Sequence, residues 1–359
     1  MRQALSRGGL VSLQRAIGSC SIGMVLSLVG TLFAQELPTF ERPVWRAVEP
    51  FSNICGVRLL SDGRAIVCDA TERTVVMLGS NGRREFSIGR WGGGPGEYQQ
   101  PGGLLRMPGD TTWLVDRTLR RFLVIGPDGS LGRTVAFPPE SQTVPVFRGT
   151  DRDGHVFFQP FWFPLEPGDG SRVPILRWFP GMESSDTIAH VLGPAPKVQV
   201  DGPSSARTNN FFVMPFTPQD DWGVFADGSV VVVRVEGYFL EIVESGGVIR
   251  RGPDVPFQAV RVTAADQRAR GQGIVEYPKT KPPFPPGATR LDGERIWVLR
   301  NAPANAPTVP WDVFDRRGRR IETVSIARDL RVVAFGTRLV YAIRTDEDGL
   351  EWLEAFPRS

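Results

Sequence analysis

The sequence predicts an all-β protein, a six-bladed β-propeller built from four-stranded antiparallel blades. Glycine and proline together make up about a fifth of the 359 residues, and both residue types break helix interiors. Short apolar segments alternate with Asp-Gly and Asn-Gly dipeptides, which form the tight turns of β-hairpins. The resulting unit recurs roughly every 50 residues, a period at which four strands make one propeller blade.

The first 34 residues predict a signal peptide that precedes the fold. Arg2, Arg7 and Arg15 stand before an apolar run over residues 22–33, and Ala34 follows that run. A basic start, a short apolar run and a small residue are typical of secretory signals, and such a run is too short to span a bilayer. The alternative is an uncleaved N-terminal anchor. We therefore expect export to the periplasm or the extracellular space.

Removal of residues 1–34 changes the charge of the chain. It takes away three arginines and no acidic residue, so the formal net charge falls from +3 to 0. Binding to nucleic acid would call for a concentrated basic stripe, so we expect none. We also expect no membrane span in the remaining residues.

Two cysteines remain after export, Cys55 and Cys68. They flank the turn at residues 61–63, so they would lie nearly opposite each other on adjacent antiparallel strands. An oxidising compartment would allow them to form one disulfide. The alternative is two buried free thiols.

The hairpin turns divide the chain into six units. The turns lie at residues 61–63, 80–82, 127–129, 153–154, 227–228, 246–247, 292–293, 317–318 and 348–349. The units span residues 51–98, 99–143, 144–210, 211–260, 261–326 and 327–359, so residues 35–359 form a single propeller domain. The last unit is short, and residues 36–50 have the composition of its missing strand. Such a strand would join the chain ends and close the ring.

Helical periodicity is confined to one short segment. Residues 263–270 carry Thr263 and Asp266 at the spacing of a capping box, in which each residue bonds the backbone of the other. We expect a short helix there, within a loop.

The first two units carry a family resemblance. In the first, a strand ends in Asp69, the next begins near Arg73, and a glycine-rich stretch over residues 89–98 precedes Pro101. The second repeats the pattern through Trp113-Leu-Val-Asp116 and Arg120-Arg-Phe. The pattern resembles the NHL-repeat, TolB-like type of secreted bacterial six-bladed propellers and covers residues 51–130. The resemblance implies the fold and leaves the function open, because such proteins are diverse.

Motifs for phosphate, zinc or nucleophilic chemistry are absent from the sequence. No Gly-Lys-Ser/Thr follows the glycine-rich stretch, so that stretch is interpreted as a link between blades. His155 and His190 are the only histidines, too few for an ordinary zinc site, and no nucleophile elbow is present. Asp151-x-Asp153-Gly154 begins like a calcium loop but lacks its glutamate. We expect no metal and no cofactor, with calcium as the alternative.

Arginines on the first strands are the candidate ligand-binding residues. They are Arg58, Arg106, Arg148, Arg290 and Arg331. The first strand of each blade lines the central channel, so these side chains could form a cationic mouth for an anionic ligand. The alternative is a general use of arginine, because the chain has 39 arginines and 3 lysines.

An aromatic run over residues 157–164 is a candidate interaction surface. It opens a proline-rich insertion, and long loops on a rigid scaffold often bind partners. Phe161 and Trp162 would form an exposed lip in this interpretation. Alternatively, the aromatic side chains pack between blades.

These observations predict an exported β-propeller that acts as a ligand-binding or protein-interaction module, with no visible catalytic constellation. The partner would be a protein or a small molecule, and we expect a monomer. The alternative is a propeller enzyme of the lactonase, hydrolase or sugar-dehydrogenase type. That enzyme would hold a metal or cofactor at the central channel.

Overall fold

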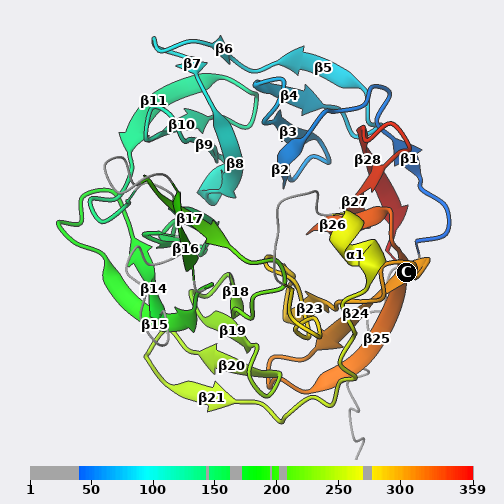
Figure 1. Ribbon diagram of the computed structural model, residues 1–359. Coiled ribbons are helices and arrows are strands. Elements are labelled where there is room, and N and C mark those ends of the chain that lie inside the picture. Colours follow the sequence, from blue (N-terminus) through cyan, green and yellow to red (C-terminus); the bar gives the residue numbers. More distant parts are fainter. Residues whose placement is uncertain are drawn as a thin grey trace, which may run out of the picture. The chain divides into compact units, whose positions relative to one another are not determined.

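The fold is a ring of six four-stranded antiparallel sheets, as predicted (Figure 1). This computed structural model describes residues 40–142, 145–161, 172–194, 196–201, 208–269 and 277–358. They belong to one compact unit, Leu37–Ser359. The predicted signal peptide lies outside the described residues. Within the described ranges, no helix is long and apolar enough to cross a membrane.

Five blades are each formed by four strands consecutive within their sheet. Blade 1 contains β2 (Ile54–Leu59), β3 (Ala65–Asp69), β4 (Thr74–Leu78) and β5 (Arg84–Ser87), and blade 2 contains β8 (Pro101–Arg106), β9 (Thr112–Asp116), β10 (Arg121–Ile125) and β11 (Leu131–Ala136). Blade 3 contains β12 (Val146–Thr150), β13 (Val156–Gln159), β14 (Arg172–Trp178) and β15 (Asp186–Leu192). Blade 4 contains β18 (Asp221–Val224), β19 (Val230–Arg234), β20 (Phe239–Val243) and β21 (Ile249–Arg251), and blade 5 contains β22 (Thr289–Asp292), β23 (Arg295–Leu299), β24 (Thr308–Phe314) and β25 (Arg320–Ala327).

Blade 6 combines the two ends of the chain. Its strands are β26 (Leu330–Phe335), β27 (Leu339–Thr345), β28 (Glu351–Pro357) and, on the outside, β1 (Trp45–Arg46). Trp45 pairs with Ala355 in antiparallel register. The prediction that an N-terminal segment supplies the missing strand and closes the ring is confirmed.

Short elements decorate the links between blades. β6 (Arg90–Trp91) and β7 (Glu97–Tyr98) pair across the glycine-rich stretch, β16 (Pro196–Asp201) pairs with β17 (Thr208–Val213), and the 3-10 helix η1 spans Pro108–Asp110. The predicted helix is α1 (Ala264–Ala269). Its capping box is formed: the Thr263 N–H donates to Asp266 Oδ2 at 2.9 Å, and the Asp266 N–H donates to Thr263 Oγ1 at 3.4 Å.

The glycine of every predicted turn lies in the left-handed region of backbone space. The φ values of these nine glycines range from 59° to 90°, a conformation that costs glycine little and other residues more. Gly63 and Gly154, for example, join the first two strands of blades 1 and 3. The turn chemistry alone therefore located the hairpins correctly.

The hydrophobic core lies between the blades. The described residues form six apolar clusters, one at each interface between neighbouring sheets. The cluster between blades 5 and 6, for example, contains the buried side chains of Trp297, Trp311 and Phe356. Each blade buries both faces against its neighbours, so each blade contributes to two of these six clusters.

The aspartates at the ends of β3 and β9, Asp69 and Asp116, have a structural role. Asp116 is fully buried at the end of β9, where its carboxylate accepts hydrogen bonds from the backbone N–H groups of Gln99, Gln100 and Leu119. Asp69 accepts equivalent bonds at the end of β3. Each carboxylate thus ties the segment that leads into a blade to the turn between its second and third strands.

Cys55 and Cys68 are joined by a disulfide, with their Cα atoms 5.4 Å apart. Gly56 pairs with Cys68, and a bulge in the register between Ile54 and Gly56 holds Cys55. Gly56 thus lies directly opposite Cys68, and Cys55 is the unpaired bulge residue next to Gly56. Cys68 is fully buried in the cluster between blades 1 and 2.

Reduction of this disulfide is expected to lower the free energy of unfolding by about 3 kcal/mol, the entropy that a loop of similar length regains in the unfolded chain. The two cysteines are 13 residues apart. Urea denaturation with and without dithiothreitol measures the effect. A Cys55→Ala/Cys68→Ala double variant should not respond to the reductant. Identical midpoints for the oxidised and reduced protein would contradict the expectation.

Candidate functional site

The innermost strands of the six blades line a central channel. They are β2, β8, β12, β18, β22 and β26, and each contacts the next around the ring (Figure 1). We call the face at which these strands begin the start face, and the face at which they end the end face. The position of a residue along its first strand therefore decides which mouth of the channel it faces.

Three of the five predicted arginines meet at the start face. Arg148, Arg290 and Arg331 line one cavity of about 430 Å³ in the channel. Arg290 and Arg331 are each the second residue of their strand, and Arg148 is the third residue of β12. We call this cavity the channel mouth.

A β-bulge directs Arg148 into the channel mouth. The register between β12 and β13 shifts between Phe147 and Gly149, which leaves Arg148 as the extra residue. Bulges re-aim side chains in this way next to binding sites. Cys55 in β2 and Val333 in β26 occupy equivalent bulges and also line the cavity.

The other two predicted arginines lie toward the end face. Arg58 and Arg106 are among the last residues of β2 and β8. The Arg58 side chain is only 6% exposed and forms an ion pair with Asp110 at 3.1 Å. Burial lowers the pKa of Arg58, as does the charge of Arg106, whereas Asp110 opposes the shift. Arg106 is exposed and lines a separate cavity of about 510 Å³. The five arginines therefore do not form one ring.

Arg290 carries the uncompensated charge of the channel mouth. One guanidinium nitrogen, Nη1, donates to the backbone carbonyls of Gly287 and Thr289 at 2.9 and 2.8 Å. Among the described residues, no carboxylate lies within ion-pair distance of it. Burial lowers the pKa of Arg290 to about 10; the charge of Arg148 adds to this effect, and the negative charge of Asp221 opposes it without forming an ion pair. The side chain is still protonated at neutral pH.

The two neighbouring arginines are each held by one carboxylate. The fully buried Asp221 accepts from Arg148 at 2.6 Å and from the Thr289 N–H at 2.7 Å. Glu351 accepts from Arg331 at 3.0 Å and from the Ile54 N–H at 2.6 Å. These bonds neutralise and orient Arg148 and Arg331, so the excess positive charge belongs to Arg290.

The opposite side of the channel mouth combines three glycines with apolar side chains such as Val57 and Leu104. Gly56, Gly102 and Gly103 line it on β2 and β8. A Cβ atom at Gly56 would lie 3.0 Å from the backbone nitrogen of Leu104, so the close approach of these two strands requires glycine. Trp222 stands beside the cations, its ring 5.9 Å from the Arg148 guanidinium. The mouth is thus cationic on one side and apolar on the other.

Sequence reasoning missed Asp221, Glu351 and Trp222. Asp221 and Trp222 begin the first strand of blade 4, and their place on that strand was the signal that could have found them. Glu351 lies on the third strand of its blade and is 20 residues from Arg331, with no local pattern that links them.

The channel mouth does not have the ligands that calcium prefers. Calcium is bound by carboxylate and carbonyl oxygens. Among the described residues, the lining contains three arginines and no aspartate, glutamate, asparagine or histidine. A divalent cation at this position would face positive charge.

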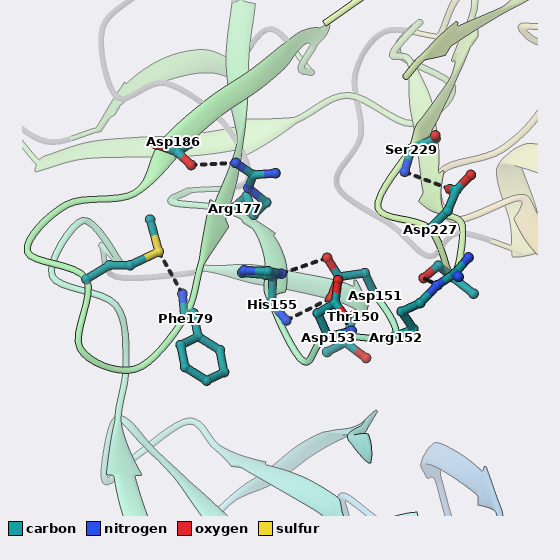
Figure 2. Close-up of polar contacts among 12 residues, drawn as sticks. Thr150, Asp151, Arg152, Asp153, His155, Arg177, Phe179, Asp186, Asp227 and Ser229 are labelled. Carbon is teal, nitrogen blue, oxygen red and sulfur yellow. Dashed lines mark hydrogen bonds and ion pairs between the residues drawn. The ribbon is translucent and has the colours of Figure 1, made fainter. Parts of the chain in front are cut away.

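The calcium-like sequence at Asp151 forms a hairpin turn. Asp151 Oδ1 accepts from the backbone N–H groups of Asp153 and His155 at 3.0 and 2.9 Å, and Oδ2 contacts His155 Nδ1 at 2.8 Å. Figure 2 shows the His155 ring directed toward Asp151. Ligand atoms of Asp151, Asp153 and His155 lie within 4.8 Å of one another. Both oxygens of the Asp151 carboxylate are thus already bonded within the turn. His190 is exposed and lies outside this group.

The aromatic segment after β13 is only partly described. Phe161 is half-buried and packs against the cluster between blades 3 and 4, which includes Phe157 and Trp222. Trp162 lies outside the described residues. The interaction lip stays a prediction.

Comparisons with known proteins identify the fold. No protein-family profile matches the chain, and no curated protein matches it. A solved structure described as an exported protein of Bacteroides fragilis is 12% identical, with a TM-score of 0.50, and the match covers 88% of this chain and 94% of that chain. The similarity is in the fold alone.

Two further solved structures match with lower scores. A member of the DUF4221 family from Bacteroides vulgatus is 10% identical over 89% of this chain and 95% of that chain, with a TM-score of 0.47. A catalytically inactive virginiamycin B lyase from Staphylococcus aureus, solved with quinupristin, is 12% identical over 90% and 98%, with a TM-score of 0.42.

Proposed function

We propose that this protein is an exported binding module whose channel mouth binds an anionic small molecule. The proposal includes the NHL-repeat, TolB-like type that the first two units resemble, action as a monomer, and a periplasmic or extracellular location. Export is supported by the signal-like sequence over residues 1–34 and by the disulfide, because disulfides persist in oxidising compartments.

The observation that carries the proposal is Arg290, which bonds two backbone carbonyls but has no carboxylate partner among the described residues. A half-buried cation without a carboxylate partner is costly, and its charge is compensated when an anion binds. Arg148 and Arg331 flank it with guanidinium groups already oriented by Asp221 and Glu351. Guanidinium groups bind carboxylate, sulfate and phosphate through paired charge-assisted hydrogen bonds.

The glycines opposite the cations provide the space. Because Gly56, Gly102 and Gly103 add no side chains, the 430 Å³ cavity stays open. This volume lies within the roughly 300–1,000 Å³ typical of small-molecule sites. The described lining residues include no histidine, lysine or carboxylate that could act as a general base, which favours binding over catalysis.

The test is calorimetric titration of sulfate at constant ionic strength, with chloride as the balancing anion. Arg290→Gln is expected to weaken sulfate binding about 10- to 100-fold, because a hydrogen bond to a charged group contributes about 1.5–3 kcal/mol. Arg106→Gln serves as the matched control, because Arg106 is exposed at the other end of the channel.

Equal weakening by Arg290→Gln and Arg106→Gln would indicate a general charge effect and would contradict the site. No measurable sulfate or carboxylate binding by the unmodified protein would reject the proposed function itself.

A further inference from the structure

A second cavity opens beside the channel mouth on the start face. Its volume is about 500 Å³, and it lies at the junction of blades 5 and 6. The apolar side chains of Leu299, Val309, Trp311 and Leu330 line it. They come from the end of β23, the first half of β24 and the start of β26. We call it the lateral cavity.

Two charged groups in the wall of the lateral cavity, Lys281 and Asp266, form an ion pair. Lys281 is buried, and its Nζ donates to Asp266 Oδ1 at 2.6 Å and to the Ala302 carbonyl at 2.8 Å. Burial tends to raise the pKa of Asp266, but hydrogen bonds from Lys281 and Thr263 outweigh it and hold that pKa below its usual value. This ion pair fixes α1 as one wall of the cavity.

Arg300, on another wall, is paired in the same way. Its Nη1 lies 3.1 Å from Oδ2 of the fully buried Asp312. The exposed Arg328 also lines the cavity, where its Nε donates to the Ala306 carbonyl at 2.6 Å, and it has no carboxylate partner among the described residues. Apart from Arg328, the described walls combine apolar side chains with paired charges. A bound group at this position would gain chiefly from leaving water.

Arg331 connects the two cavities. It lines both the channel mouth and the lateral cavity, and its side chain is 44% exposed. Arg290 and Arg331 both line the channel mouth, so an anion bound there is attracted by both cations. A ligand whose acidic group lies on these arginines would have the apolar cavity directly beside that group.

We propose that the ligand is an amphipathic organic anion, with its acidic group at Arg290 and Arg331 and an apolar body in the lateral cavity. This inference rests on the proposed function and names its ligand class. An inorganic anion would leave the lateral cavity unused, whereas an alkyl or aryl carboxylate would fill both.

The test uses a series of straight-chain carboxylates from acetate through butyrate and hexanoate to octanoate, titrated into the purified protein beside sulfate. Affinity is expected to rise about two- to fourfold with each methylene, as apolar surface leaves water. Arg290→Gln should weaken the binding of every member of the series, because all share the same acidic group.

Ala304→Trp places a large side chain in the lateral cavity, since Ala304 is a half-buried lining residue of the loop between β23 and β24. It should abolish the dependence of affinity on chain length. Ala226→Trp, on the exposed lining of the end-face cavity, is the matched control and should leave that dependence unchanged. Ala304→Glu gives a second measurement should the tryptophan variant fail to fold.

The outcomes separate the two proposals. Sulfate binding combined with equal affinities for acetate and octanoate would overturn the amphipathic ligand and leave the anion site standing. A chain-length dependence that survives in both Ala304 variants would place the apolar body elsewhere and would also overturn it. Failure of sulfate and every carboxylate to bind would reject the proposed function.

Discussion

Deletion of residues 40–48 is expected to cost at least about 4 kcal/mol of folding free energy, because two large aromatic contacts and the pairing of β1 with β28 are lost. Trp45 packs edge-on against Tyr341 at 5.7 Å, and Phe40 packs against Phe356 at 5.3 Å. The backbone N–H of Ala47 donates to the Leu353 carbonyl at 2.8 Å. All of these contacts disappear with the deletion.

The effect is larger than that of an ordinary edge strand because β1 also joins blade 6 to blade 1. The Trp45 ring lies against Gly82 of blade 1, where a Cβ atom would be 2.5 Å from it. Without β1 the propeller loses this contact between blades 6 and 1, and the edge of β28 becomes free to pair with other chains. We therefore expect a lower melting temperature and aggregation on heating.

Thermal melting with an added peptide tests the explanation. A peptide of residues 40–50 should restore the melting temperature of the deleted protein, because it can add back the missing strand. The same peptide with Trp45→Ala should restore it less well at equal concentration. A deleted protein that melts within about 2 °C of the intact chain would contradict the role of β1 as the closing strand.

Replacement of Asp312 by alanine is expected to lower the free energy of unfolding by about 3–5 kcal/mol, because it leaves buried polar groups without their partner. The carboxylate is fully buried and accepts from Tyr238 Oη at 2.8 Å, from Arg300 Nη1 at 3.1 Å and from Thr323 Oγ1 at 2.6 Å. Burial raises the pKa of Tyr238, and the negative charge of Asp312 raises it further, so the hydroxyl donates to the carboxylate throughout the neutral range.

Urea denaturation measures the loss. Asp254→Ala is the control, because Asp254 is exposed and its ion-pair partner is the neighbouring Arg251; surface pairs contribute about 0–1 kcal/mol. Asp312→Asn keeps one acceptor oxygen and has an amide nitrogen in place of the other, so its free energy of unfolding should fall less than that of the alanine variant. A loss of less than 1 kcal/mol for Asp312→Ala would show that Arg300 and Tyr238 find other partners.

The fold could be predicted because its signals are local. Each hairpin depends on a glycine that adopts positive φ, as at Gly63, and on the short apolar strand segments on either side of the turn. The closing strand was predicted by counting, since the last unit lacked a strand and residues 36–50 could supply it. The signal peptide over residues 1–34 and the lip at Trp162 lie outside the described residues and stay predictions.

The site could be predicted only in part. The sequence indicated arginines on the first strands but gave no means of placing them along the channel axis. That place depends on where each strand begins and on bulges such as the one at Arg148, and both are set by packing between blades. The result is three arginines at one mouth and two toward the other.

By itself, the sequence determined the number of blades, the turns, the closure of the ring and the presence of arginines on the strands that line the channel. Only the tertiary structure decided which charges are compensated: Asp221 and Glu351 pair with Arg148 and Arg331, whereas Arg290 has no carboxylate partner in the part of the chain that the structure describes. It also created the lateral cavity, whose walls come from α1, from β23, β24 and the start of β26, and from the loops around them. The physical reason is that turn propensities act over a few residues, whereas charge compensation and cavity shape depend on side chains brought together from distant blades.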